Sequence, residues 1–87
     1  MKNITDTDGV SIEAYLTECR LKVGRSIREI REKRSLSQEQ LADKMNISRS
    51  TISKIESGKF NCSIDYLSKF ASFLDFEIIL QDSQRNL

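Results

Sequence analysis

The side chains in this sequence that could take part in chemistry are mostly basic, and they are concentrated in the middle of the chain. Residues 20–59 hold eleven Lys and Arg residues against five Asp and Glu residues, a net charge of +6. Residues 1–19 have a net charge of −3 and residues 60–87 a net charge of −2. Such a localised positive excess is typical of a surface that binds an anionic partner such as nucleic acid. A solvated charged helix gives similar counts, so charge alone leaves both interpretations open.

The sequence lacks most of the side chains that enzymes use. It has no His, so it offers neither an imidazole acid–base group nor a Cys–His nucleophile. Its two cysteines, Cys19 and Cys62, are 43 positions apart, and no Gly-rich phosphate loop or paired acidic motif is present. We therefore expect no catalytic residue, metal site, cofactor or small-molecule substrate, and we expect both thiols to be reduced and partly buried.

Length and hydropathy limit the class of protein. With 87 residues the chain is expected to form one small domain with a modest core. No apolar run approaches the ~20 residues that span a membrane, and the N-terminal sequence has no apolar segment typical of a signal peptide. We expect a cytoplasmic protein without membrane contact, in which residues 1–10 are loosely ordered.

Apolar spacing predicts helices in the first half of the chain. Residues 11–34 repeat apolar side chains every three or four positions, which indicates either one long helix or two helices broken near Gly24. Ser37 is a predicted N-cap for a short helix over residues 38–45, and Gln40 is placed to complete a capping box.

Two further helices are predicted after this one. Ser48 caps a helix that runs to Ser57 and is ended by Gly58. Ser63 caps the last helix, whose apolar face is expected to be formed by Ile64, Leu67, Phe70, Ala71 and Leu74.

The segment over residues 76–81 has the pattern of a β-strand, with Phe76, Ile78 and Leu80 on one face. No other strand is expected, so this one has no partner within its own chain, and an unpaired apolar edge is a liability. We therefore predict that it pairs with the same strand of a second copy across a two-fold axis. The alternative is that these residues extend the preceding helix and are buried there.

Residues 38–57 have the arrangement of a helix-turn-helix, in which a tight turn joins two short helices. Helices that cross steeply need a small side chain at their contact, which Ala42 supplies. The turn needs a residue that tolerates positive φ, and Asn46 is acceptable there. The apolar contacts between the two helices are expected at Leu41, Met45, Ile47, Ile52 and Ile55.

Residues 25–75 resemble the XRE family of helix-turn-helix domains, the group of the lambdoid phage repressors and Cro proteins. The resemblance is carried by IREIR at 27–31, LSQEQLA at 36–42 and ISRSTISKIESG at 47–58. In these segments the apolar, small and Gly positions are in register, and Asn46 in the turn is the one departure. The resemblance implies an all-α, five-helix, lambda-repressor-like domain, to which the predicted C-terminal strand adds pairing across a homodimer.

The resemblance also implies which residues contact DNA. The helix that follows Ser48 would lie in the major groove, where Arg49, Ser50 and Lys54 would read base edges. Arg49 would suit guanine, whose O6 and N7 accept two hydrogen bonds from one guanidinium. Contacts to the DNA backbone are expected at Gln38, Thr51, Lys59 and Asn61.

One pair of residues is expected to be structural. In the family, an arginine and a glutamate at the positions of Arg31 and Glu56 form a semi-buried ion pair between the first helix and the recognition helix. Removal of one partner would leave the other charge buried and unpaired.

A second, shorter resemblance concerns the ends of the domain. The FEIIL segment at 76–80 is similar to the dimer strand of Hip-type antitoxins, and the extra N-terminal helix to Hig-type antitoxins. These similarities imply a homodimeric repressor that binds a palindromic operator in double-stranded DNA, represses its own operon and captures a toxin protein. The polar tail, residues 82–87, is a candidate toxin contact. The alternatives are a phage or mobile-element repressor without a toxin partner, and a protein-interaction adaptor.

Overall fold

The computed structural model describes residues 11–83, which form four helices and no strand. Within this range no helix is both long and apolar enough to cross a membrane. The predictions for residues 1–10 and for the end of the polar tail lie outside the described residues. The helices are α1 (Ile12–Lys33), α2 (Gln38–Met45), α3 (Arg49–Glu56) and α4 (Ile64–Leu74).

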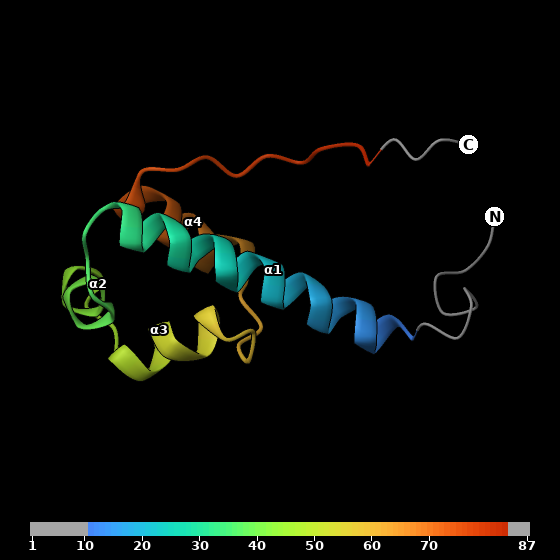
Figure 1. Ribbon diagram of the computed structural model, residues 1–87, viewed down its shortest axis with the longest axis horizontal. Helices are drawn as coiled ribbons and strands as arrows, with labels where there is room; N and C mark the ends of the chain where they lie inside the picture. Colours follow the sequence, from blue (N-terminus) through green and yellow to red (C-terminus); the bar gives the residue numbers. More distant parts are fainter. Residues whose placement is uncertain (1–10, 84–87) are drawn as a thin grey trace.

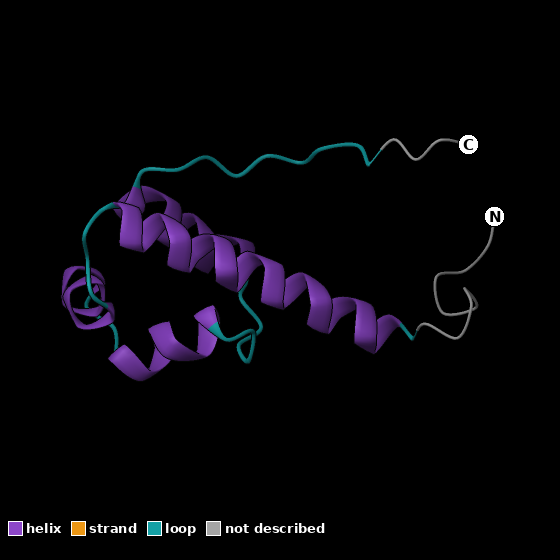
Figure 2. Ribbon diagram, viewed as in Figure 1, coloured by secondary structure: helices purple, strands orange, loops and turns teal. Residues whose placement is uncertain are grey.

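The arrangement of the helices leaves part of α1 uncovered. Helices α2 and α3 lie on one side of the C-terminal half of α1, and α4 packs against that same half (Figure 1). The N-terminal half of α1 extends beyond the other three helices (Figure 1). After α4 the chain runs back along α1 as a loop (Figure 2).

The predicted five-helix count is wrong for the described part of the chain, because α1 is one continuous helix. Gly24 does not break it. At this position α1 passes so close to the end of α3 that a Cβ atom on Gly24 would lie 2.4 Å from the carbonyl oxygen of Ile55. The glycine is therefore required for a close approach of two backbones and has no helix-breaking role.

Side-chain caps determine where the helices begin. The capping box is confirmed: the Ser37 hydroxyl accepts from the Gln40 amide at 3.0 Å, and the Gln40 side chain accepts from the Ser37 amide at 2.8 Å. Ser48 and Ser63 also cap their helices as predicted. Asn46 adopts the expected left-handed conformation, with φ 57°. Each boundary of the helix-turn-helix is thus set by local chemistry.

The core lies where the four helices meet. Ala42 is buried at the junction, as its small size predicts. Ile64 was expected on the buried face of α4 but is 65% exposed, because it begins the helix ahead of the residues that reach the core. The buried apolar residues are Ile27, Leu41, Ala42, Ile52, Ile55, Phe70 and Leu74.

The predicted strand is not formed in the single described chain. Helix α4 ends at Leu74 because Asp75 adopts a left-handed conformation with φ 60°, so the alternative of an extended helix is also wrong. The Arg34 guanidinium donates to the carbonyl oxygens of Leu74 at 2.8 Å and Asp75 at 3.0 Å, and so binds this end of α4. Residues 76–83 have no neighbouring strand to bond with in one chain. Pairing across a dimer through Phe76, Ile78 and Leu80 stays a prediction.

Candidate nucleic-acid interface

Helix α3 has one buried face and one exposed face. Ile52, Ile55 and Glu56 are buried against the rest of the domain. Burial of this face holds the helix in one orientation, so the side chains on its other face are presented to solvent in a defined direction. Those exposed side chains include the three predicted base readers, Arg49, Ser50 and Lys54.

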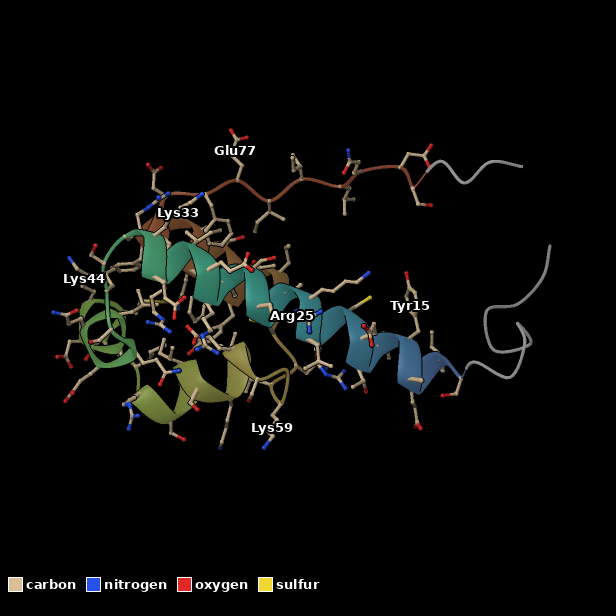
Figure 3. The ribbon with its side chains drawn as sticks, in the orientation of Figure 1. Tyr15, Arg25, Lys33, Lys44, Lys59 and Glu77 are labelled. Atoms are coloured by element: carbon tan, nitrogen blue, oxygen red, sulfur yellow. The ribbon has the colours of Figure 1, made fainter. Side chains whose placement is uncertain are left out.

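A shallow polar hollow of about 430 Å³ lies over the exposed face of α3. The structure thus brings together four of the residues predicted to contact DNA, although they come from both ends of α3 and from the loop after it. Lys59 projects on the α3 side of the molecule, and Lys33 lies on the opposite side (Figure 3). The residues that line the hollow are Arg49, Ser50, Ser53, Lys54, Ser57 and Lys59.

The electrostatic character of the hollow is positive. Its lining contains three basic side chains and no acidic one. The first turn of α3 also carries no acidic residue, and its free backbone N–H groups contribute the positive end of the helix dipole. An anion therefore meets favourable charge from both the side chains and the helix N-terminus.

The other three predicted DNA-backbone residues lie outside the hollow. Thr51 is half-buried, and its hydroxyl hydrogen-bonds that of Ser48 at 2.8 Å as part of the α3 cap. Asn61 is exposed and lines a separate, smaller pocket beside α1. The Gln38 amide donates to a carboxylate oxygen of Glu56 at 3.0 Å. Thr51 and Gln38 therefore form intramolecular hydrogen bonds that the sequence pattern did not indicate.

A buried ion pair joins α1 to α3. The Arg31 guanidinium donates to both carboxylate oxygens of Glu56, at 2.6 and 3.0 Å, and to the carbonyl oxygen of Leu36 at 2.7 Å. Arg31 is 7% exposed and Glu56 8% exposed. The hydrogen bond with the Glu56 carboxylate raises the pKa of Arg31 above its ordinary value, so the guanidinium stays charged. Together with Gln38, this network holds the C-terminal end of the helix whose opposite face lines the hollow.

The turn after α3 positions Lys59. Gly58 has φ 77°, and its amide donates to the carbonyl oxygen of Ile55 at 3.1 Å. The Lys59 amide donates to the carbonyl oxygen of Lys54 at 2.8 Å. Arg20 supports the turn from α1, with its Nε 3.4 Å from the Gly58 carbonyl oxygen. The role of Arg20 could not be predicted from the sequence. Its helix carries many exposed charged residues, and the sequence does not show which of them contacts a residue 38 positions later.

Comparisons with known proteins agree with this geometry. Residues 27–80 match the family described as Helix-turn-helix. Over 58 residues the chain is 40% identical to the immunity repressor protein of Bacillus phage phi105, a match that covers 67% of this chain and 40% of the repressor. The chain thus spans less than half the length of that relative. The crystal structure of the restriction-modification controller protein C.AhdI from Aeromonas hydrophila is similar with a TM-score of 0.65 and 37% identity, over 69% of this chain and 91% of the controller. The chain therefore belongs to the XRE-type helix-turn-helix family of DNA-binding regulators.

Proposed function

We propose that this protein is a sequence-specific transcriptional repressor that places α3 in the major groove of DNA. The observation that carries the proposal is the pairing of a fully anchored face of α3 with an exposed face that holds Arg49, Ser50 and Lys54. Arg49 is the first residue of the helix, where side chains reach base edges, and its guanidinium matches the two acceptors of guanine. The relatives named as an immunity repressor and a controller protein support a regulatory function.

Backbone contacts are proposed around these base readers. Lys59, in the loop beside the hollow, is placed to meet a phosphate. Gln38 uses one amide hydrogen on Glu56, and its second amide hydrogen is available for a phosphate. Thr51 and Asn61 complete the proposed set. These contacts set the register of the protein on DNA and carry no base information.

We also propose that the protein acts as a homodimer on a palindromic operator. One α3 contacts only a half-site, and a two-fold dimer presents two such helices about 34 Å apart, one turn of B-DNA. Footprints on a bound operator should show two inverted half-sites whose centres are about 10 bp apart or a multiple of it. Half-sites at any other spacing would contradict a two-fold symmetric dimer that places both α3 helices on one face of the DNA.

The antitoxin role stays a prediction, and its test is separate. The antitoxin prediction rests partly on a strand over residues 76–81, and that segment forms no strand within the described chain. The phage immunity repressor among the relatives favours the alternative of a phage or mobile-element repressor without a toxin partner. Co-purification of this chain with the product of the adjacent gene, and loss of that product's toxicity on co-expression, would support the antitoxin role.

The main proposal can be tested by measuring, with fluorescence anisotropy, how tightly the protein binds DNA from upstream of its gene. The Arg49→Ala variant should bind each half-site about 5- to 160-fold more weakly, because a bidentate guanine contact contributes about 1–3 kcal/mol. The Lys59→Ala variant should bind all sequences more weakly and lower the salt slope by about one for each protomer bound. Lys33→Ala is the matched control, since this exposed lysine lies away from α3. Equal binding by Arg49→Ala and Lys33→Ala would overturn the assignment of α3.

A further inference from the structure

The N-terminal half of α1 carries an apolar stripe that the rest of the described chain leaves largely exposed. Ile12, Tyr15, Leu16 and Val23 are between 37% and 48% exposed. The first turns of α1 extend beyond the other helices (Figure 1), and Tyr15 points away from α3 (Figure 3). Val23 lies where the other helices begin, beside Ile55 and Leu67. A row of large apolar side chains on a small domain marks a surface that binds another molecule.

The spacing of the stripe is that of a helix–helix seam. Ile12, Leu16, Cys19 and Val23 follow one another at steps of four, three and four residues. This 3.5-residue repeat keeps apolar side chains facing one neighbouring helix along the whole length of a pair. From Val23 on, the same side of α1 meets the rest of the chain, because Val23 and Ile30 face the returning tail and Ile27 is buried. The uncovered part is therefore a short seam that lacks its second helix.

We propose that residues 12–23 of α1 pair antiparallel with the same residues of a second copy of this chain. A two-fold axis between positions 17 and 18 brings Ile12 opposite Val23 of the partner subunit, and Leu16 opposite Cys19 of the partner subunit. In heptad notation Leu16 and Val23 are at a, and Ile12 and Cys19 are at d, so each a residue meets a d residue, as an antiparallel pair requires.

Charge on the flanks of the seam selects this orientation. The first turns of α1 carry Glu13, and the following turns carry Arg20 and Lys22. Glu13 and Arg20 are both at heptad position e, on one flank of the seam, and Lys22 is on the other flank. Antiparallel pairing brings Glu13 next to Arg20 of the partner subunit, whereas parallel pairing does not bring these two charges together. Neither Glu13 nor Arg20 has a salt bridge within residues 11–83, and Arg20 donates only to the Gly58 carbonyl oxygen and the Thr17 hydroxyl there.

The dimer geometry suits two half-sites on DNA, and in this respect the inference rests on the proposed function. At a 1.5 Å rise per residue, Gly24 lies about 10 Å along α1 from the axis. Helix α3 has its C-terminal end at Gly24 and runs away from the axis for its eight residues, about 12 Å. The middles of the two α3 helices are then about 32 Å apart along α1, close to the ~34 Å of one DNA turn.

Both recognition helices also face the same way. At 3.6 residues per turn, the stripe is centred roughly 100° around α1 from Gly24 and Arg31, which face α3. The two-fold axis of an antiparallel pair runs perpendicular to α1 and to the direction of the seam. The two-fold axis is therefore nearly parallel to the direction from α1 to α3. Rotation about this axis places the α3 helices of both protomers on the same face of the dimer.

Sedimentation equilibrium without DNA tests the surface. The unmodified chain should dimerise, and Leu16→Glu should weaken dimerisation at least tenfold. Glu13→Lys and Arg20→Glu should each weaken it, and the double variant should recover most of the loss, because the opposite charges are exchanged. Leu80→Glu, on the fully exposed tail, is the matched control and should remain dimeric. Circular dichroism checks that each variant keeps its helix content.

The outcomes separate this surface from the proposed function. A chain that is monomeric at all concentrations would overturn the proposal, as would a Leu16→Glu variant that remains dimeric. Dissociation by Leu80→Glu with Leu16→Glu intact would assign the dimer to the tail and overturn the α1 surface. If Leu16→Glu abolishes the dimer and the unmodified chain binds no DNA, the α1 surface stands and the repressor function fails.

Discussion

The two halves of α1 have the same apolar spacing and opposite surroundings. In the C-terminal half Ile27 is 2% exposed, Gly24 touches the α3 backbone and Arg31 is held by the buried carboxylate of Glu56. In the N-terminal half Ile12 and Leu16 face solvent. Periodicity in a sequence therefore indicates that one face of a helix needs a neighbour, and it does not say whether that neighbour belongs to the same chain.

The most damaging single change should remove the ion pair of the packed half. Glu56→Ala leaves the Arg31 guanidinium buried without its partner and should cost about 3–5 kcal/mol of the free energy of unfolding, measured by urea denaturation. The control is Glu32→Ala, since Glu32 pairs with Arg28 in an exposed position, 3.3 Å apart, and should cost less than ~1 kcal/mol. Equal losses would mean that burial does not distinguish the two pairs.

A matched pair of truncations compares the two halves directly. Ile27→Ala should destabilise the domain by about 2–5 kcal/mol, because it opens a cavity in the core. Leu16→Ala removes a side chain of similar size from an exposed site and should change stability by less than about 0.5 kcal/mol. Thermal or urea unfolding should be measured at low protein concentration, so that the monomer is the reference. A large effect of Leu16→Ala there would show that the N-terminal half is covered within its own chain.

The boundary between the halves can be tested at Gly24. The added methyl group of Gly24→Ala would meet the carbonyl oxygens of Ile55 and Glu56 at 2.4 and 2.7 Å, and these belong to backbone that cannot simply rotate away. The overpacking should cost about 1–3 kcal/mol, although alanine favours the helix itself by about 1 kcal/mol. A lower Tm is therefore expected. An unchanged or higher Tm would show that α1 and α3 can separate here without loss.

The smallest effect concerns the thiol that faces α1 from the loop after α3. Burial raises the pKa of Cys62, so in the folded protein the thiol stays protonated to higher pH than in the unfolded chain. In a Cys19→Ser background, Cys62 should react with iodoacetamide at pH 8 more slowly when folded than in denaturant, because the thiolate is the reactive form. Because the pKa of this thiol is higher in the folded protein, the unfolded chain loses the proton first. The free energy of unfolding should therefore fall slightly as the pH rises above the pKa of the unfolded thiol. Equal reaction rates would contradict the burial of this thiol.

The parts of the fold that follow from local chemistry could be predicted from the sequence. Ser37, Ser48 and Ser63 each bond to a backbone amide three residues later, so the starts of α2, α3 and α4 depend only on neighbouring residues. The left-handed turn at Asn46 is local in the same sense. The continuity of α1 could not be predicted, because the role of Gly24 depends on how closely a helix thirty residues later approaches it.

The same division applies to the candidate site. Arg49, Ser50 and Lys54 lie together because helical spacing places them on the face opposite Ile52 and Ile55. The Gln38 contact with Glu56 and the Arg20 contact with Gly58 join residues 18 and 38 positions apart, and periodicity carries no information on such pairs. The tail over residues 76–83 could not be assigned either, since an extended segment acquires a strand structure only from a neighbour.

If residues 12–23 form the proposed dimer contact, the amount of protein in the cell has a strong effect on the amount of dimer. Residues 12–23 make only about three helical turns, and an interface this short dissociates when the protein is dilute. Operator occupancy would then rise with the square of the protein concentration below the dimer dissociation constant. A cell that halves its supply of this protein would lose about three quarters of the dimer in that regime, so that, for the proposed repressor, a modest dilution would free the operator.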